Sequence, residues 1–170
     1  MHSRGRSARR SEGLVEGLIE RLGEARVVGL SGESGSGKTT LGAALAEALG
    51  ATLVHMDDWY RLPPDENSRA RRRDLEIVGP GEVALGALDE HIGGLDGPVV
   101  VEGTWVLLLG TPQVQVFLER TWQESHRDRI ARGRDPIDDH TPRILAREQQ
   151  ILGFYLDRVD VRVDSAWQLR

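Results

Sequence analysis

A short glycine-rich segment carries the clearest chemical signal in the chain. Residues 32–39, called the P-loop below, read GESGSGKT and fit the pattern G-x-x-x-x-G-K-[ST]. Glycines let backbone N–H groups turn toward one point, and a following helix aims the positive end of its dipole at the same point. Such a loop binds phosphate groups. The residues expected to contact a nucleotide are Gly32, Glu33, Ser34, Gly35, Ser36, Gly37, Lys38, Thr39 and Thr40.

Two residues at the end of this loop have separate expected roles. The ammonium group of Lys38 adds positive charge beside the β- and γ-phosphates, and the hydroxyl of Thr39 is placed to ligate Mg²⁺. Lys38 is the only lysine in a chain with 22 lysines and arginines. An arginine there would change the geometry of the contact. The pattern therefore predicts ATP and Mg²⁺ as ligands, with Lys38 in a catalytic role.

Acidic residues follow two apolar segments of the chain. Asp57 and Asp58 come directly after ATLVHM (51–56), and Glu102 ends PVVVE (98–102). An acid in the first position can accept a proton from an attacking hydroxyl, and an acid in the second can hold Mg²⁺ directly or through water. Acids at strand ends also serve as helix caps or face solvent, so both interpretations stay open here, as does the choice between Asp57 and Asp58.

The elements that must position these residues alternate between strand and helix. Because such βαβ units are parallel with right-handed crossovers, ligands bind beyond the carboxyl ends of the strands. The expected fold class is α/β, a three-layer sandwich with about five parallel strands. Strands are predicted at 26–31, 51–56, 98–102, 114–118 and 159–163, the last at an edge; helices at 11–23, 38–49, 80–91, 121–132 and 142–156; an irregular stretch at 61–80.

Length and composition set the broad class. A chain of 170 residues predicts one domain, here 11–170, behind a disordered basic tail at 1–10. The absence of cysteine excludes thiol catalysis and Cys-ligated zinc and fits a cytoplasmic protein. A net charge of −5 argues against a nucleic-acid partner. No apolar run reaches the ~20 residues that a membrane span needs, and the oligomeric state stays open.

Four segments together resemble one known family. The loop GESGSGKTT (32–40), DDWY (57–60), VVVEG (99–103) and RDRIARGRD (127–135) are similar in order and spacing to the uridine kinase and phosphoribulokinase family. VDVRV (159–163) is similar to that family's late strand, and the likeness runs from about Val27 to Asp164. The resemblance implies a P-loop NTPase fold of the nucleoside monophosphate kinase type. It also implies ATP- and Mg²⁺-dependent phosphoryl transfer to a hydroxyl of a small molecule.

The resemblance also assigns roles to individual residues. By position, Asp57 is the general base, Lys38 binds phosphate, and Thr39 with Glu102 forms the Mg²⁺ site. The arginine-rich string lies in a lid around residues 127–140, which supplies positive charge to the transferring phosphoryl group and keeps water away. The expected lid arginines are Arg127, which would contact the nucleotide, and Arg132 and Arg134, which would be catalytic. An exposed helix face with i, i+4 ion pairs is the alternative for this string.

The acceptor site is expected in the segment that follows Asp58. The segment between Asp58 and Glu102 is shorter than in nucleoside kinases of the family, and Trp59 replaces the more usual Phe. A shallow, positively charged pocket built from 59–79 favours a small polar or anionic alcohol slightly over a nucleoside such as uridine, cytidine or nicotinamide riboside. The cluster Arg69, Arg71, Arg72 and Arg73 either holds an anionic acceptor or faces solvent.

Two other function classes are alternatives to a kinase. A GTPase switch needs N-K-x-D, which a chain whose only lysine is in the P-loop does not contain. A nucleotide-binding regulatory module without catalysis is the second alternative. The presence of Asp57, Glu102 and the arginine string argues against it, and turnover of ATP with a panel of hydroxyl compounds separates the two.

Overall fold

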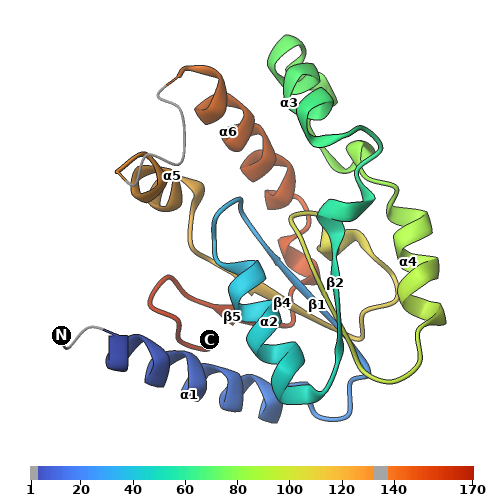
Figure 1. The fold of residues 1–170 in the computed structure, drawn as a ribbon, viewed down its shortest axis with the longest axis vertical. Helices are drawn as coiled ribbons and strands as arrows, with labels where there is room; N and C mark the ends of the chain where they lie inside the picture. The colour runs from blue at the N-terminus through green and yellow to red at the C-terminus, as the bar shows by residue number, and fades with distance from the viewer. Residues whose placement is uncertain (1–3, 132–137) are drawn as a thin grey trace.

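The computed structural model describes residues 4–131 and 138–170, with residues 4–12 as backbone only. Its centre is a sheet of five parallel strands in the order β2-β3-β1-β4-β5 (Figure 1). The expected α/β class with about five parallel strands is confirmed, and the last strand does lie at an edge. The strands are β1 (Val27–Gly32), β2 (Thr52–His55), β3 (Val99–Glu102), β4 (Val114–Leu118) and β5 (Val161–Val163).

The register brings the functional strand ends together. Leu30 of the central strand β1 pairs with Glu102 of β3 on one side and with Val116 of β4 on the other. His55 of β2 pairs with the same Glu102. The carboxyl ends of β1, β2 and β3 therefore meet at one edge of the sheet, where the P-loop begins.

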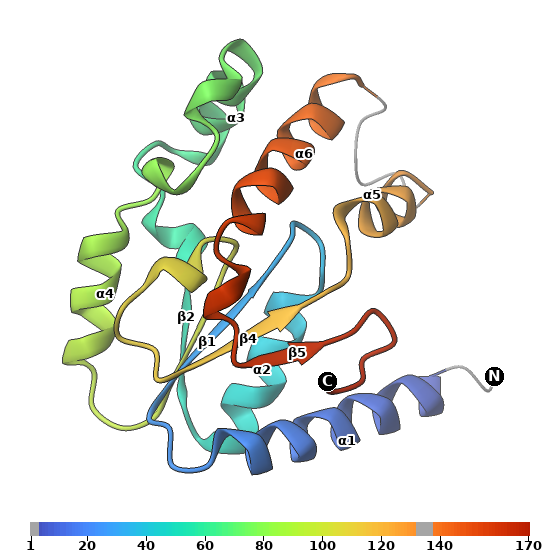
Figure 2. The same ribbon diagram turned by 180° about the vertical axis from the view of Figure 1, so that it is seen from behind.

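Helices cover both faces of the sheet, as a three-layer sandwich requires. Helices α1 and α2 pack on one face, and α4 with the end of α6 packs on the other. Figures 1 and 2 show α3, α5 and α6 around the carboxyl edge of the sheet, beyond the loop that joins β1 to α2. The helices are α1 (Arg4–Leu22), α2 (Lys38–Leu49), α3 (Pro64–Arg73), α4 (Leu85–Gly94), α5 (Trp122–Ala131) and α6 (His140–Gly153).

Each face has its own hydrophobic core, because successive residues of a strand point to opposite sides. Val100 packs with Leu41 and Leu45 of α2 on one face. Val99 and Val101 pack on the other face among residues of α4 and α6. All five side chains are at most 1% exposed, and burial of this kind contributes about 1.5–3 kcal/mol for each large aliphatic residue.

The first helix is longer than the sequence pattern indicated. It begins at Arg4, whereas a start at Ser11 after a disordered tail was expected. Residues 4–10 include alanine and several arginines, which are good helix formers, and contain no proline. The backbone hydrogen bonding of the helix therefore continues past the Ser11 cap signal toward the N-terminus.

The stretch expected to be irregular, 61–80, contains helix α3 (Pro64–Arg73) and two short 3₁₀ helices, η2 (Leu75–Ile77) and η3 (Pro80–Glu82). The expectation of an irregular loop was wrong. Proline is favoured in the first turn of a helix, and acidic residues there and arginines in the last turn suit the helix dipole. The helix expected from Pro80 divides into η3 and α4. The other 3₁₀ helices are η1 (Met56–Trp59), η4 (Val106–Leu108) and η5 (Leu156–Arg158).

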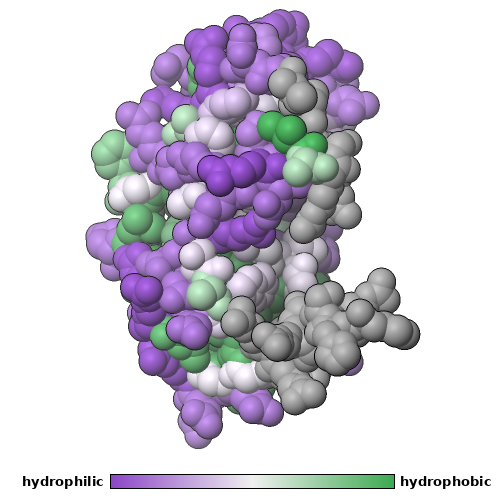
Figure 3. Space-filling view, turned by 90° about the vertical axis from the view of Figure 1, so that its left-hand side faces the viewer, coloured by the Kyte–Doolittle hydropathy of each residue, from purple (hydrophilic) through white to green (hydrophobic). Residues whose placement is uncertain are grey.

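The surface is mostly polar on the side that faces the viewer in Figure 3, where hydrophobic residues form small separate groups. Within residues 4–131 and 138–170, none of the helices combines the length and apolar character needed to cross a bilayer.

Candidate active site

The P-loop joins β1 to α2 at the carboxyl edge of the sheet, the strand–loop–helix context that its pattern requires. Gly35 and Gly37 have φ angles of 76° and 104°, which favour glycine. A Cβ atom at Gly35 would lie 2.8 Å from atoms of both Ser125 and Arg129. At Gly37 it would lie 2.9 Å from the ring of Trp167. Both glycines are therefore needed for backbone conformation and for space.

Lys38 points from the start of α2 into the P-loop. Its Nζ donates a 2.9 Å hydrogen bond to the backbone carbonyl oxygen of Glu33, and the residue is only 9% exposed. Burial lowers the pKa of Lys38, while the negative charges of Glu102, Glu148 and Asp57 act in the opposite direction. These carboxylates favour the ammonium form, the form that neutralises phosphate.

Thr39 and Glu102, the two residues expected to hold Mg²⁺, lie in contact with each other. The Thr39 hydroxyl donates a 3.3 Å hydrogen bond to Oε1 of Glu102, which is 5% exposed. His55 Nδ1 lies 2.7 Å from the same oxygen. Hydroxyl and carboxylate oxygens are ligands that suit Mg²⁺, so the pair fits that ion. His55, which the sequence pattern shows only as a strand-end residue, orients the carboxylate of Glu102.

The described residues contain no group of three or more His, Cys, Asp or Glu side chains able to hold a metal by themselves. An ion held by Thr39 and Glu102 would therefore depend on nucleotide phosphates and water for its other ligands. This is how Mg²⁺ commonly binds in enzymes that use ATP.

Asp57 lies in η1, directly after β2, and lines the same pocket as Lys38 and Glu102. Burial raises the pKa of Asp57, and the charge of Glu102 adds to the rise, while Lys38 opposes it. A raised pKa makes the carboxylate a stronger base. Asp58, the alternative base, does not line this pocket.

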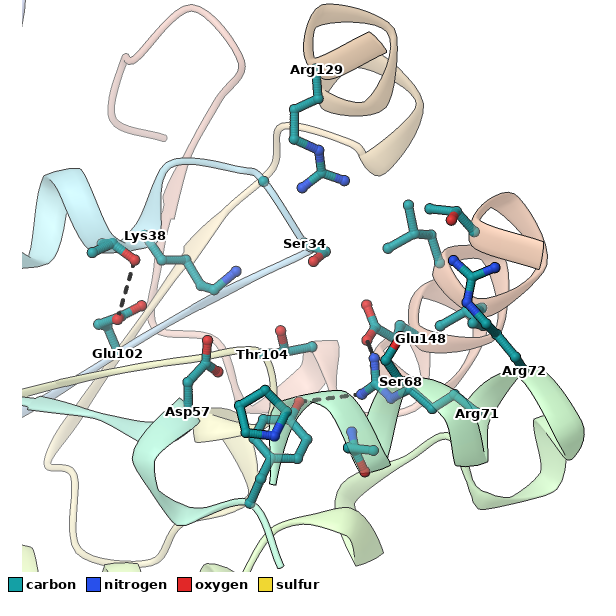
Figure 4. Close-up of a pocket in the computed structure, with 18 residues that line it drawn as sticks. Ser34, Lys38, Asp57, Ser68, Arg71, Arg72, Glu102, Thr104, Arg129 and Glu148 are labelled. Atoms are coloured by element: carbon teal, nitrogen blue, oxygen red, sulfur yellow. Dashed lines mark hydrogen bonds and ion pairs between the residues drawn. The ribbon is translucent and has the colours of Figure 1, made fainter. Parts of the chain in front are cut away.

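The pocket has a volume of about 480 Å³ and is bounded by the P-loop, η1, the end of β3 and helices α3, α5 and α6. Figure 4 shows Lys38 and Asp57 on one side of the cavity and Glu148 with Arg71 on the opposite side. Thr104 lies between the two sides. The space is large enough for a small molecule beside a phosphoryl group.

The other predicted P-loop contacts divide between the pocket and its surroundings. Ser34 and Gly35 line the pocket. Ser36 is 1% exposed beneath the loop, where a Cβ at Gly32 would lie 2.6 Å from its hydroxyl. Thr40 is exposed and does not line the pocket.

Helix α5 places a different arginine in the pocket from the one expected. Arg129 lines the cavity close to Gly35. Arg127 is exposed and is not among the lining residues. Arg132 and Arg134 lie in 132–137, outside the described residues, so their predicted roles stay predictions. The sequence pattern does not show whether Arg127 or Arg129 enters the pocket, because both lie in the same arginine-rich string.

The arginines of the α3 cluster lie in different surroundings. Arg71 is 14% exposed at its side chain and bonds to Glu148 Oε1 and Glu82 Oε2, each at 2.9 Å, and to the Tyr60 hydroxyl at 3.2 Å. Arg72 pairs with Asp138 at 2.9 Å at the pocket rim. Arg69 and Arg73, the other two members, are exposed and do not line the pocket.

Glu148 is a pocket residue that sequence reasoning missed. It is 3% exposed and lies on the buried stripe of α6 with Ile144, Leu145 and Leu152. Burial raises the pKa of Glu148, and Arg71 and Lys38 oppose the rise. The sequence does contain a signal for this position. Glu148 lies four residues from both Ile144 and Leu152 in a predicted helix, which places it on the same face as those apolar residues.

Glu33 connects the P-loop to two helices. Its Oε2 accepts a 2.6 Å hydrogen bond from the backbone N–H of Trp122, at the start of α5. Its Oε1 accepts a 2.9 Å hydrogen bond from Nε2 of Gln149 in α6. The expected nucleotide-contacting residue Glu33 thus positions both helices that face the loop.

Comparison with known proteins finds similarity in structure alone. No family model and no curated protein matches the chain. A gluconokinase from Sinorhizobium meliloti is 20% identical and has a TM-score of 0.54, with 84% of this chain and 83% of that chain covered. A shikimate kinase from Acinetobacter baumannii, solved with shikimate, is 16% identical with a TM-score of 0.54 and coverage of 85% and 86%.

A third solved structure extends the likeness to a nucleoside kinase. The deoxyadenosine kinase from M. mycoides with bound dATP is 12% identical, has a TM-score of 0.56, and shares 84% of this chain and 92% of its own. These proteins act on different molecules and have one architecture in common. Together with the strand order and the P-loop geometry, they show that this chain has the P-loop kinase fold, of the nucleoside monophosphate kinase type.

Proposed function

We propose that the protein is an ATP- and Mg²⁺-dependent phosphotransferase that phosphorylates a hydroxyl group of a small molecule. One observation carries this proposal: Lys38, Asp57 and the Thr39–Glu102 pair line one side of a pocket of about 480 Å³ at the carboxyl edge of the sheet. Phosphate-binding charge, a base and metal ligands are the parts that phosphoryl transfer needs.

The proposed reaction assigns each group one task. Asp57 takes the proton of the acceptor hydroxyl as its oxygen forms a bond to the γ-phosphorus of ATP. The bond from that phosphorus to the β,γ-bridging oxygen breaks, and ADP leaves. Lys38 and Arg129 stabilise the negative charge on the phosphoryl oxygens. Mg²⁺ held by Thr39 and Glu102 would neutralise charge on the β- and γ-phosphates.

The motif likeness to the uridine kinase family supports this proposal, and the solved neighbours, which include a gluconokinase, a shikimate kinase and a deoxyadenosine kinase, are compatible with it. A nucleoside acceptor is therefore the alternative within the same activity. A catalytically silent nucleotide-binding module is the alternative outside it.

The experiment has two parts, which separate binding from transfer. Calorimetry measures ATP binding with Mg²⁺ for the wild type and for Lys38→Ala. Mass spectrometry then follows transfer of phosphate from ATP to a panel of nucleosides, sugars, polyols and hydroxy acids. Transfer that is lost in Asp57→Asn supports the kinase. Tight ATP binding without transfer to any compound favours the silent module.

A further inference from the structure

The side of the pocket opposite Lys38 and Asp57 has a charge pattern that selects among acceptors. This side, called the acceptor wall, is built by α3 and α6 (Figure 4). Its lining residues are Asn67, Ser68, Arg71, Ile144, Leu145 and Glu148.

Two of the arginines that line the pocket, Arg71 and Arg72, lie at this wall and are bound to carboxylates, whereas Arg129 lies on the P-loop side near Gly35. Arg71 is held by both Glu82 and Glu148, and Arg72 is held by Asp138. Two positive groups thus face three negative ones. An anionic acceptor that used Arg71 would have to displace a carboxylate from a nearly buried ion pair and leave that carboxylate unpaired, which is strongly unfavourable.

One carboxylate oxygen of Glu148 accepts a hydrogen bond, and the other has no hydrogen-bond donor among the described residues. Oε1 accepts from Arg71 at 2.9 Å. Oε2 is buried, and no group within the described part of the chain hydrogen-bonds to it. Glu148 lines the cavity, and in Figure 4 its carboxylate is turned toward the space that Lys38 and Asp57 face from the other side. Buried polar atoms in native proteins normally have partners. Oε2 has almost no accessible surface in this structure, so a donor on a ligand reaches it only when the Glu148 carboxylate turns further toward the cavity.

We propose that the acceptor is a hydroxyl compound without an anionic group, bound through a hydroxyl or ammonium donor to Oε2 of Glu148. The proposal rests on the proposed phosphotransferase activity and narrows its acceptor to uncharged polyols, nucleosides or amino alcohols. It sets aside one of the two alternatives for the arginine cluster, that of an anion site, because Arg71 supports the wall through Glu82 and Glu148. The hydroxyls of Ser68 and Thr104 and the edge of Ile144 complete a surface suited to a polar, uncharged molecule.

Compounds that differ in charge but little in size provide the test. Glucose, glucosamine and gluconate form one series and glycerol and glycerate a second, and uridine is included as an uncharged nucleoside. Ligand-observed NMR measures binding of each compound to the full chain with Mg²⁺ and a non-hydrolysable ATP analogue, and a separate assay measures transfer from ATP. In at least one series, an uncharged or cationic member is expected to bind at least tenfold more tightly than the anionic one.

This design distinguishes a failure of the acceptor proposal from a failure of the phosphotransferase proposal. Preferred binding of the anionic members, or binding of none of the uncharged and cationic compounds, overturns the acceptor proposal. Binding of an uncharged compound without its phosphorylation overturns the phosphotransferase and leaves the charge preference supported.

The matched variants are Glu148→Gln and Glu76→Gln. The first is expected to weaken binding of the preferred acceptor by roughly 10- to 100-fold, which is more than it changes ATP binding, and to reduce the preference against the anionic member. Glu76 also contacts α6, through Arg147 at 3.4 Å, but its side chain is 82% exposed, so its variant controls for lost charge. A purely structural role for Glu148 would leave the charge preference unchanged, and that result contradicts the proposal. If Glu148→Gln does not fold, the wild-type series alone decides.

Discussion

Lys38 and Glu33 close the P-loop on itself: Nζ of Lys38 donates a 2.9 Å hydrogen bond to the backbone carbonyl oxygen of Glu33. The ammonium group is therefore held inside the loop rather than in solvent. Burial lowers the pKa of Lys38, and the negative charges of Glu102, Glu148 and Asp57 oppose that effect. The hydrogen bond fixes the amino group at the place where phosphate binding requires positive charge.

Lys38→Ala is expected to lower kcat by at least ~10²-fold, the usual scale for loss of one preorganised charge-stabilising group. The hydrophobic residues that pack beneath α2 do not change, so the melting temperature should stay within a few degrees. A coupled ADP-release assay and thermal unfolding measure the two effects. Near-normal turnover would contradict the assignment of the P-loop. Lys38→Arg, which keeps the charge but changes its geometry, should remain strongly impaired.

Asp57→Asn is expected to reduce kcat by about 10²–10⁴-fold, the range for loss of a general base, with little change in ATP affinity. Asp58→Asn is the matched control, since Asp58 is the next residue of η1 and does not line the pocket. Steady-state kinetics of the two variants decide between them. A larger loss in Asp58→Asn would move the base to that residue.

The pH profile provides an independent check on Asp57 within the same kinetics. A base works only when it is deprotonated, and burial together with Glu102 raises the pKa of Asp57 above its ordinary value of 3.8. Activity should therefore fall on the acid side at a pH above 3.8, and the fall should follow ionisation of one group. An acid limb that persists in the residual activity of Asp57→Asn would assign it to another residue.

Glu102→Gln is expected to raise the Mg²⁺ concentration needed for half-maximal activity by roughly tenfold, because a neutral amide is a weaker ligand than a carboxylate. The side-chain amide of this variant has nearly the same size as the carboxylate and still occupies the position beside the Thr39 hydroxyl and His55, so the local packing should be preserved. Titration of activity with Mg²⁺ at saturating ATP measures the effect. The same metal dependence as in the wild type would exclude Glu102 as a ligand.

Arg129→Ala should lower kcat more than Arg127→Ala does, by about 10-fold or more, since phosphoryl transfer depends on positive charge at the reacting oxygens. Arg129 lines the pocket beside Gly35, whereas Arg127 is exposed outside it. The two residues lie on one short helix, so the variants are matched for local effects. A larger loss with Arg127→Ala would restore the role expected from the family resemblance.

Arg71→Ala is expected to reduce the free energy of unfolding by about 3–5 kcal/mol, the cost of leaving nearly buried carboxylates without their partner. Arg71 bonds both Glu82 and Glu148, whose side chains are each 4% exposed. Arg73→Ala, at an exposed position of the same helix, should change stability by less than ~0.5 kcal/mol. Urea unfolding of both variants measures the difference. Equal stability of the two would show that the Arg71 network contributes little.

The strands and the helix next to the P-loop were predictable because their signals are local. Helix α2 has the predicted bounds, Lys38–Leu49, and so does strand β4, Val114–Leu118. Leucines at four-residue spacing and a glycine C-cap define the first, and a short apolar run defines the second. Parallel topology then brings the predicted acids of β2 and β3 to one edge.

Helix α3 was not predictable in this way, because it has almost no apolar stripe. Its only buried residue, Asn67, is polar and bonds to Glu82 Oε1 at 3.1 Å. The helix is fixed by contacts with distant residues, such as that of Arg71 with Glu148. Residues separated by 77 positions leave no periodic pattern in the sequence, so the wall opposite Lys38 is visible only in three dimensions.

The Glu33 side chain changes how the P-loop pattern should be read in this protein. In G-x-x-x-x-G-K-[ST], position 33 is one of the unrestricted letters, and a pattern search accepts any residue there. Here the carboxylate bonds Trp122 at one helix and Gln149 at another. A phosphate-binding loop from another kinase that lacks a carboxylate at this position would satisfy the pattern and still disconnect those two helices. Glu33 must therefore be kept together with Gln149, whereas the backbone N–H at position 122 is available from any residue except proline.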